Sequence, residues 1–163
     1  MKKNSTELLQ DLAAYVLADS RKPVCVKKAA EMIRAERGYR WVGIYKVTRG
    51  ECVILAGTGE EPPTYPRFPA TQGLCGAVVE SQKTLVVPDV QKDLRYLPTF
   101  WTTRSEIVVP IVHEAKKRVG GIIDVESDKL NAFTEDDQDF LEHASALLAQ
   151  AICAPKKHNA PAG

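Results

Sequence analysis

Apolar residues recur with helical spacing near both ends of the chain and follow a shorter period in between. Residues 4–20 open with Asn4 and Glu7 at capping-box spacing, which predicts an amphipathic helix. A second helix is predicted over 23–38, between a proline and a glycine, and a third over 135–152 after a capping threonine. The apolar stripes are Leu8, Leu9, Leu12, Val16 and Leu17 in the first helix, and Phe140, Leu141, Ala144, Leu147, Leu148 and Ala151 in the third.

Between these helices lie segments with the composition and two-residue period of strands. They are 39–47, 51–57, 84–87, 105–113 and 118–127. Short polar turns join the first two and the last two, so each pair is predicted to form a β-hairpin. Strands joined by short turns, with helices gathered before and after them, favour an α+β fold around an antiparallel sheet.

Two irregular segments flank a short helix that is predicted to start at Gly73. Residues 58–72 contain four prolines, and residues 91–103 are rich in large aromatic side chains. Long loops on a rigid scaffold often carry binding residues. We therefore expect these loops to cover one end of the sheet, with a small-molecule pocket beneath them.

Composition narrows the function classes. The chain has 163 residues, 44% apolar and 26% charged, which suits a single globular domain. Its net charge of +1, with both signs mixed, argues against nucleic-acid binding. No apolar run is long enough for a bilayer and no signal core follows the basic start, so we expect a cytosolic protein that binds no membrane. The tail 153–163 is expected to be flexible.

The four cysteines, Cys25, Cys52, Cys75 and Cys153, form no CxxC motif and have no neighbouring histidine pair. This spacing argues against a metal site and against a disulfide framework, so reduced thiols are expected. Cys75 lies between two glycines at the predicted helix start, where free N–H groups lower a thiol pKa. It equally suits a small buried residue in a tight corner, and the local pattern leaves both readings open.

Several motifs, taken in order, resemble a GAF domain over residues 5–152. They are WVGIY, GLCGAVVES with TLVVPDV, SEIVVPI, GGIIDVES and FTEDDQDFLEHASALLAQAI. Within that superfamily the sequence is most similar to the free methionine-(R)-sulfoxide reductases, which act on the free amino acid. The resemblance implies a central antiparallel sheet of five to six strands, with the N- and C-terminal helices on one face and loops over a pocket on the other.

The resemblance also implies a ligand pocket made of Trp41, Tyr45, Glu106, Asp124 and Glu126. Side chains two apart on a strand point to the same face, so the two acids of the last strand are directed together, with the third on the neighbouring strand. Such acids repel one another unless a cation, typically an ammonium group, lies among them. A nearby indole adds a cation–π wall. Core packing for the aromatics and solvent exposure for the acids are the alternatives.

The chain departs from the reductases in its cysteines. That family has three: one about ten residues before the GxxCG cysteine, the GxxCG cysteine itself, and the usual nucleophile in the loop before SEI. The first position falls at or near Tyr65 and the third at or near Thr99, and neither loop contains a cysteine. Only Cys75 remains, so we expect catalytic turnover to be less favoured than ligand binding.

Three functions follow from these residues. The first is a stand-alone GAF protein that binds a small amino-acid-like or cationic metabolite and signals through a separate output protein, with no cofactor. The second is a divergent free methionine-(R)-sulfoxide reductase that uses Cys75. The third is a dimerisation module with an empty pocket, in which the terminal helices pair two copies; those helices could equally pack on their own sheet alone.

Cyclic nucleotides fit poorly because an acidic pocket repels phosphate, and His113 suits a strand-end surface residue better than a haem ligand.

Overall fold

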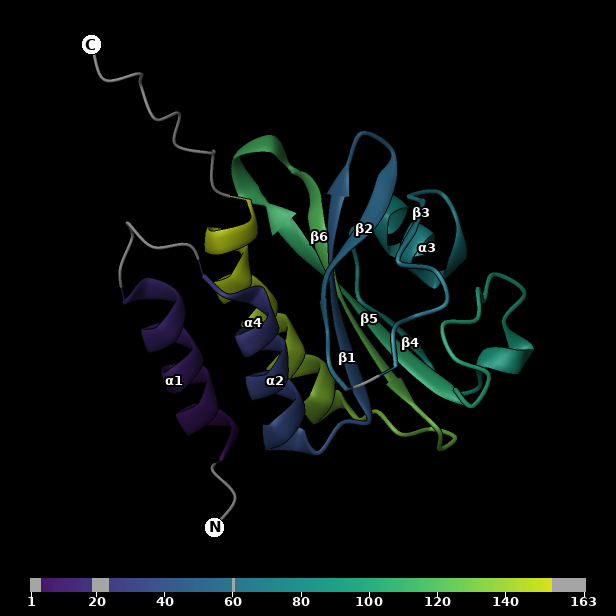
Figure 1. Ribbon diagram of the computed structural model, residues 1–163, viewed down its shortest axis with the longest axis horizontal. Helices are drawn as coiled ribbons and strands as arrows, with labels where there is room; N and C mark the ends of the chain where they lie inside the picture. The colour runs from purple at the N-terminus through teal and green to yellow at the C-terminus, as the bar shows by residue number, and fades with distance from the viewer. Residues whose placement is uncertain (1–3, 19–23, 60, 154–163) are drawn as a thin grey trace.

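In the computed structural model, helices and loops cover opposite faces of one antiparallel sheet (Figure 1). The structure describes residues 4–18, 24–59 and 61–153. The six strands lie in the order β3-β2-β1-β6-β5-β4, which confirms the α+β class and the strand number expected from the sequence. Pro23, expected in the first turn of the second helix, and the tail after Cys153 lie outside the described residues.

Three helices lie on one side of the sheet: α1 (Ser5–Leu17), α2 (Val26–Arg37) and α4 (Glu135–Ile152), with α2 and α4 next to the sheet and α1 outside them. The predicted capping boxes at the starts of α1 and α4 are present, and Gly38 ends α2 in the left-handed conformation that glycine adopts without strain. Helices α2 and α4 bury apolar residues against the sheet, and α1 buries its apolar stripe mainly against α4 and α2. Leu17 is the exception in α1, because it lies at the last turn and is 56% exposed.

The strands are β1 (Trp41–Thr48), β2 (Glu51–Gly57), β3 (Arg67–Pro69), β4 (Leu85–Val87), β5 (Ser105–His113) and β6 (Arg118–Ser127). Both predicted hairpins, β1 with β2 and β5 with β6, are present. Strand β3 corrects the sequence prediction, which treated all of 58–72 as loop. It has only three residues and lies between prolines, so its pairing with β2 leaves no periodic signal.

The other face carries the short helix α3 (Gly73–Ser81) and two loops, 61–66 and 88–104, the second of which includes the 3-10 turn η1 (Val90–Lys92). Gly73 has a φ of +72°, and a side chain at Gly76 would lie 2.5 Å from the backbone of Thr71, so both glycines are needed for this tight start. Thr64 ties the loops together, because its hydroxyl and its N–H both donate to the carbonyl oxygen of Thr99.

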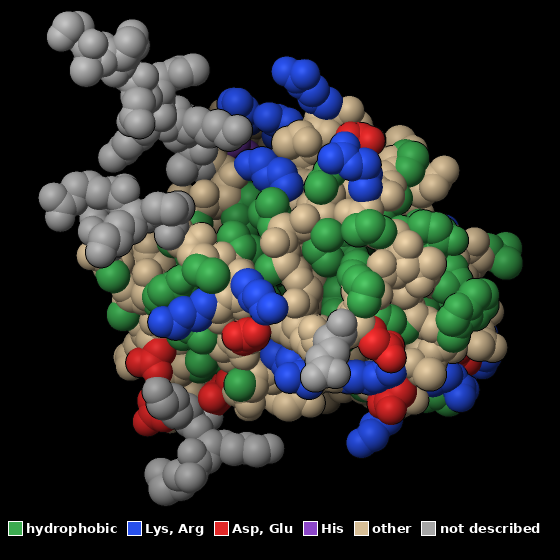
Figure 2. Space-filling view, viewed as in Figure 1, with side chains coloured by type: hydrophobic (Ala, Val, Ile, Leu, Met, Phe, Trp, Pro, Cys, Tyr) green, Lys and Arg blue, Asp and Glu red, His purple; other side chains and the backbone are tan. Residues whose placement is uncertain are grey.

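The loop side of the molecule exposes several large hydrophobic residues. In Figure 2, hydrophobic side chains gather in the right half of the surface, over the β1–β2 hairpin and the neighbouring loops. Leu94 and Trp101 of the second loop are the most exposed, at 104% and 89%. No helix in the described part of the chain has both the length and the apolarity to cross a membrane.

Candidate functional site

The sheet registers bring the predicted acids into neighbouring rows on the face that the loops cover. Glu126 on the central strand β6 is paired with Trp41 of β1 on one side and with Glu106 of β5 on the other. Asp124 occupies the next row on the same face, because side chains two residues apart point the same way. The side chains of these acids are 1–3% exposed, so solvent exposure, the alternative left open by the sequence, is excluded.

Two glycines seat the indole of Trp41 beside this cluster. Gly43 pairs with Gly57 on β2 and with Asp124 on β6. A Cβ atom at Gly43 would lie 2.2 Å from Cη2 of Trp41, and one at Gly57 would lie 3.3 Å from Cζ2. The indole therefore lies against the sheet where both glycines leave room for it. Phe100 closes over it edge-on, with ring centroids 5.2 Å apart.

The three carboxyl groups are short of hydrogen-bond donors. Glu106 Oε2, Asp124 Oδ1 and Glu126 Oε1 are buried without a partner. Burial raises the pKa of Glu106 and of Asp124 well above their usual range, and the mutual repulsion of the acids adds to this.

Glu126 differs from the other two acids because loop hydroxyls reach it. The Thr103 hydroxyl donates to its Oε2, and the nearby Thr99 hydroxyl also lowers its pKa. Burial raises the pKa of Glu126, while these hydroxyl groups oppose the rise. The second loop therefore contacts the acid cluster directly, a contact that sequence reasoning missed because threonines in a loop carry no recognisable signal.

Cys75 lies inside this cluster and not at its edge. Its Sγ and one carboxylate oxygen each of Glu106 and Asp124 lie within 4.8 Å of one another. The thiol is buried, and its pKa is raised by that burial and by the negative charges of Asp124 and Glu106. This effect is opposite to the lowering expected from a helix start, because desolvation and neighbouring acids outweigh the dipole of a short helix. Together these groups form a donor set that could hold a metal ion.

A second thiol lies near Cys75. Cys52 of β2 is buried in the same apolar cluster, and it acts on the pKa of Cys75. Burial raises the pKa of Cys52 itself to about 11. Sequence reasoning assigned Cys52 to a strand but could not place it near Cys75, because the two residues meet only through the tertiary fold.

The cavity at this cluster is small. It measures about 20 Å³, which is room for about one water molecule. Tyr45 is part of its lining and packs edge-on against Phe68, with ring centroids 5.5 Å apart. Tyr65 and Thr99 also line it beside Cys75. The positions at which the sequence resemblance expects further cysteines therefore do face this cavity, with a phenol and a hydroxyl in place of thiols.

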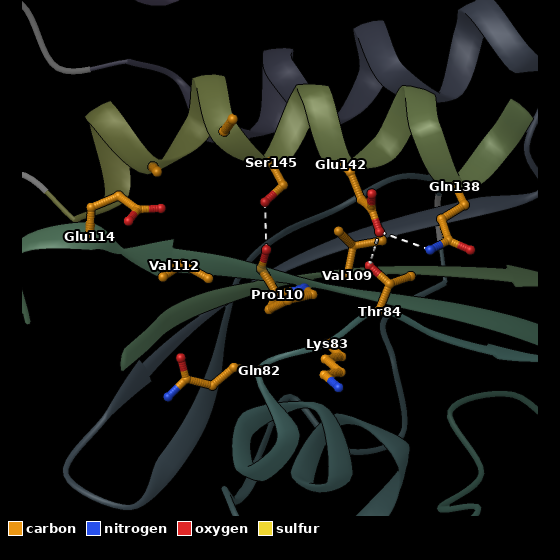
Figure 3. Close-up of a pocket in the computed structure, with 12 residues that line it drawn as sticks. Gln82, Lys83, Thr84, Val109, Pro110, Val112, Glu114, Gln138, Glu142 and Ser145 are labelled. Atoms are coloured by element: carbon orange, nitrogen blue, oxygen red, sulfur yellow. Dashed lines mark hydrogen bonds between the residues drawn. The ribbon is translucent and has the colours of Figure 1, made fainter. Parts of the chain in front are cut away.

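A larger hollow lies elsewhere, between α4, β5 and the end of α3 (Figure 3). It measures about 610 Å³ and none of the predicted site residues lines it. Its polar side chains hydrogen-bond with one another or with the backbone: Glu142 with Thr84 and Gln138, and Ser145 with the Pro110 carbonyl oxygen. None of the partnerless buried atoms in the described residues lies in this groove, so the acid cluster remains the candidate site.

Comparison with known proteins agrees with the observed fold. The chain matches the GAF domain family over residues 24–152. It belongs to that family. It is 30% identical over 142 residues to "GAF domain-containing protein A" of Dictyostelium discoideum, covering 86% of this chain and 87% of that protein.

Other relatives of this GAF protein are reductases. It is 31% identical over 110 residues to the free methionine-R-sulfoxide reductase of Saccharomyces cerevisiae, covering 66% of this chain and 60% of the yeast enzyme. Its fold matches the free methionine-R-sulfoxide reductase of Neisseria meningitidis, solved with its substrate, at a TM-score of 0.80 and 29% identity, covering 91% of this chain and 87% of that one. The relatives thus include both a protein known by its GAF domain alone and enzymes of one class.

Proposed function

We propose that this GAF protein binds a small amino-acid-like metabolite through the ammonium group of that ligand. The observation that carries the proposal is the set of partnerless carboxylate oxygens of Glu106, Asp124 and Glu126, buried together beside Trp41. A buried acid cluster of this kind is destabilising when empty, and a cation removes both the repulsion and the missing hydrogen bonds. An ammonium group offers up to three donors, and the indole face attracts its charge.

The relatives indicate which ligand to test first, and the volume of the cavity indicates that the loops must move for it to bind. The reductase relatives act on free methionine-R-sulfoxide, and one was solved with its substrate, so this amino acid is the first ligand to test. A cavity of about 20 Å³ cannot enclose it. Binding therefore requires loops 61–66 and 88–104 to separate, which breaks the Thr64 to Thr99 hydrogen bonds and lifts Phe100 from Trp41.

Trp41 supplies the test, because its fluorescence reports on the site. The chain has two tryptophans, and Trp101 is 89% exposed on the second loop. In the Trp101→Phe variant, Trp41 is the only source of tryptophan fluorescence. We expect saturable changes in its emission with L-methionine-(R)-sulfoxide and no change with the N-acetylated compound, which lacks the ammonium charge.

Two substitutions make the test specific to the acids. Glu106→Gln and Asp124→Asn keep the side-chain size but remove the negative charge, and each is expected to weaken binding by about tenfold or more, since a charge-assisted hydrogen bond contributes roughly 1.5–3 kcal/mol. Equal binding of the free and N-acetylated amino acids, or full affinity in both variants, would show that the acids do not recognise an ammonium group.

A second candidate function is reduction of free methionine-R-sulfoxide, and the position of Cys75 in the same cavity favours it. In that reaction the Cys75 thiolate attacks the sulfoxide sulfur, the sulfur–oxygen bond of the substrate breaks, and the oxygen passes to Cys75 with a proton from solvent, which leaves methionine and a cysteine sulfenic acid. An external thiol then forms a disulfide with Cys75 and releases water, and a second thiol restores the cysteine. The raised pKa of Cys75 opposes the first step.

Turnover is measured by NADPH consumption in the presence of thioredoxin and thioredoxin reductase. We expect none above background. Turnover that disappears in Cys75→Ser would instead assign this protein to the reductases. We further propose that the ligand-bound protein signals through a separate output protein. Pairing of two copies through the terminal helices is a separate proposal.

A further inference from the structure

The acid cluster contains a soft donor that an ammonium ligand does not use. Cys75 Sγ, from the start of α3, faces the carboxylates of Glu106 on β5 and Asp124 on β6, all within 4.8 Å of one another. We infer that Cys75, Glu106 and Asp124 form a tripod site for a single divalent transition-metal ion, with Zn²⁺ as the reference ion. This site goes beyond amine binding, because it depends on the thiol.

The donor types define the class of metal. One thiolate with two carboxylates suits a borderline ion such as Zn²⁺, Co²⁺ or Fe²⁺, whereas Mg²⁺ and Ca²⁺ prefer oxygen donors alone. Around a tetrahedral Zn²⁺ the donor atoms lie roughly 3.5 Å apart. Rotations that move each side chain by about an ångström therefore convert the present spacing into a coordination sphere.

Independent features point to a cation at this place. Glu106 Oε2 and Asp124 Oδ1 are buried and have no partner, although almost all buried polar atoms in proteins have one. Both residues line the cavity of about 20 Å³ together with Cys75, a space matched to one ion or one water. Three protein donors leave a fourth position for water or for a ligand.

The fold explains why sequence spacing argued against a metal site. The three residues come from a helix and two strands, and they lie 31 and 18 positions apart. Metal motifs that are recognisable in sequence place their ligands in one short segment or in two. Here only the sheet register and the packing of α3 bring the ligands together.

Cobalt provides a direct test. The tag-free protein carrying Cys25→Ser and Cys153→Ser lacks the thiols that are exposed or half-buried. Titration of this protein with Co²⁺ is expected to give one equivalent of bound metal, a thiolate-to-cobalt absorption band in the near ultraviolet and intense visible bands of four-coordinate cobalt. Added Zn²⁺ is expected to abolish these bands. This readout needs no substitution inside the site.

Substitutions then identify the side chains that coordinate the metal. In the same background, Cys75→Ser is expected to remove the charge-transfer band and to weaken Zn²⁺ binding by about 100-fold. Cys52→Ser, which changes the other buried thiol, and Glu126→Gln, which changes the acid outside the tripod, are expected to leave the band and the affinity within about threefold. Absence of the band in the parent, or its persistence in Cys75→Ser, overturns the metal site.

Failure here is distinguishable from failure of the proposed function. Amine binding is measured with a chelator present and is expected to survive in Cys75→Ser but to weaken in Glu126→Gln, the reverse of the metal pattern. Because the amine and the metal both need Glu106 and Asp124, equimolar Zn²⁺ is expected to reduce amine affinity. Amine binding without any cobalt band would overturn the metal site alone.

Discussion

Buried acids at the site oppose folding of the ligand-free protein. The pKa values of Glu106 and Asp124 are raised in the folded state by burial, so the folded protein holds their protons more tightly than the unfolded chain does. Its free energy of unfolding therefore falls as the pH rises above the ordinary carboxyl range of about 4. The residues proposed to bind the ligand therefore reduce stability, a trade-off that is common at functional sites.

This relation predicts the effect of neutral substitutions. With a chelator present and no ligand, Glu106→Gln and Asp124→Asn are each expected to raise the free energy of unfolding at neutral pH by about 1 kcal/mol or more. Their stability is also expected to fall less between about pH 4 and pH 8. Urea unfolding across that range measures both quantities. Destabilisation at neutral pH in both variants would contradict the electrostatic account.

The position of the Trp41 indole is expected to depend on the absence of a side chain at Gly43. Gly43→Ala places a Cβ atom 2.2 Å from the indole, so the ring must move away from its position against the sheet. We expect a loss of roughly 1–3 kcal/mol in stability and a shift of Trp41 emission in the Trp101→Phe background. Gly57→Ala is the matched control, because its Cβ atom would lie 3.3 Å away. An effect of Gly57→Ala as large as that of Gly43→Ala would show that the indole does not depend on Gly43.

The second loop, residues 88–104, covers the acid cluster. Phe100 of this loop packs on Trp41, and its Thr103 hydroxyl bonds to Glu126. If the loop must open for binding, Phe100→Ala is expected to speed both association and dissociation of the amine by several-fold, since an aromatic pair contributes about 0.5–1.5 kcal/mol.

Stopped-flow fluorescence in the Trp101→Phe background measures these rates. Leu94→Ala is the control on the same loop, because this side chain is fully exposed and is expected to leave both rates unchanged. Rates that are equal in Phe100→Ala and the parent would mean that Phe100 does not limit access to the pocket.

The same elements show which features sequence could predict. The two-residue period put Asp124 and Glu126 on one face, and the predicted hairpin put Glu106 on the neighbouring strand. The pairing of Glu106 with Glu126 was not predictable, because it depends on the register shift between Ile111 and Val112. The burial of Cys75 among acids was not predictable, because it depends on how α3 packs over β5 and β6. The same holds for the Thr64 to Thr99 link, which joins two loops that carry no periodic pattern.

In the whole molecule, the sheet separates the helical face from the face that carries the acid cluster. On the helical face, Asp137 caps α4 and accepts a hydrogen bond from the buried Tyr39 hydroxyl. Arg37 lies 3.6 Å from the same carboxylate. The acid cluster lies on the opposite face, in a separate apolar cluster with Trp41 and Cys75. Substitutions on the helical face should therefore change stability without changing ligand affinity.

Asp137→Ala tests this separation. It removes the helix cap and the partner of Tyr39, so we expect a loss of roughly 1–3 kcal/mol in stability with ligand affinity unchanged. Asp136→Ala is the control, because Asp136 is exposed and its ion pair with Arg37 is expected to contribute less than about 1 kcal/mol. A large loss of affinity in Asp137→Ala would show that the two faces are coupled.

The central claim is that buried, partly protonated carboxyl groups become charged when a cation binds among them. Titration calorimetry at about pH 6, in buffers of different ionisation enthalpy, counts the protons exchanged on binding. For L-methionine-(R)-sulfoxide the account predicts release of protons to the buffer, which is reduced in Glu106→Gln and in Asp124→Asn. Tight binding with no net proton release would contradict it.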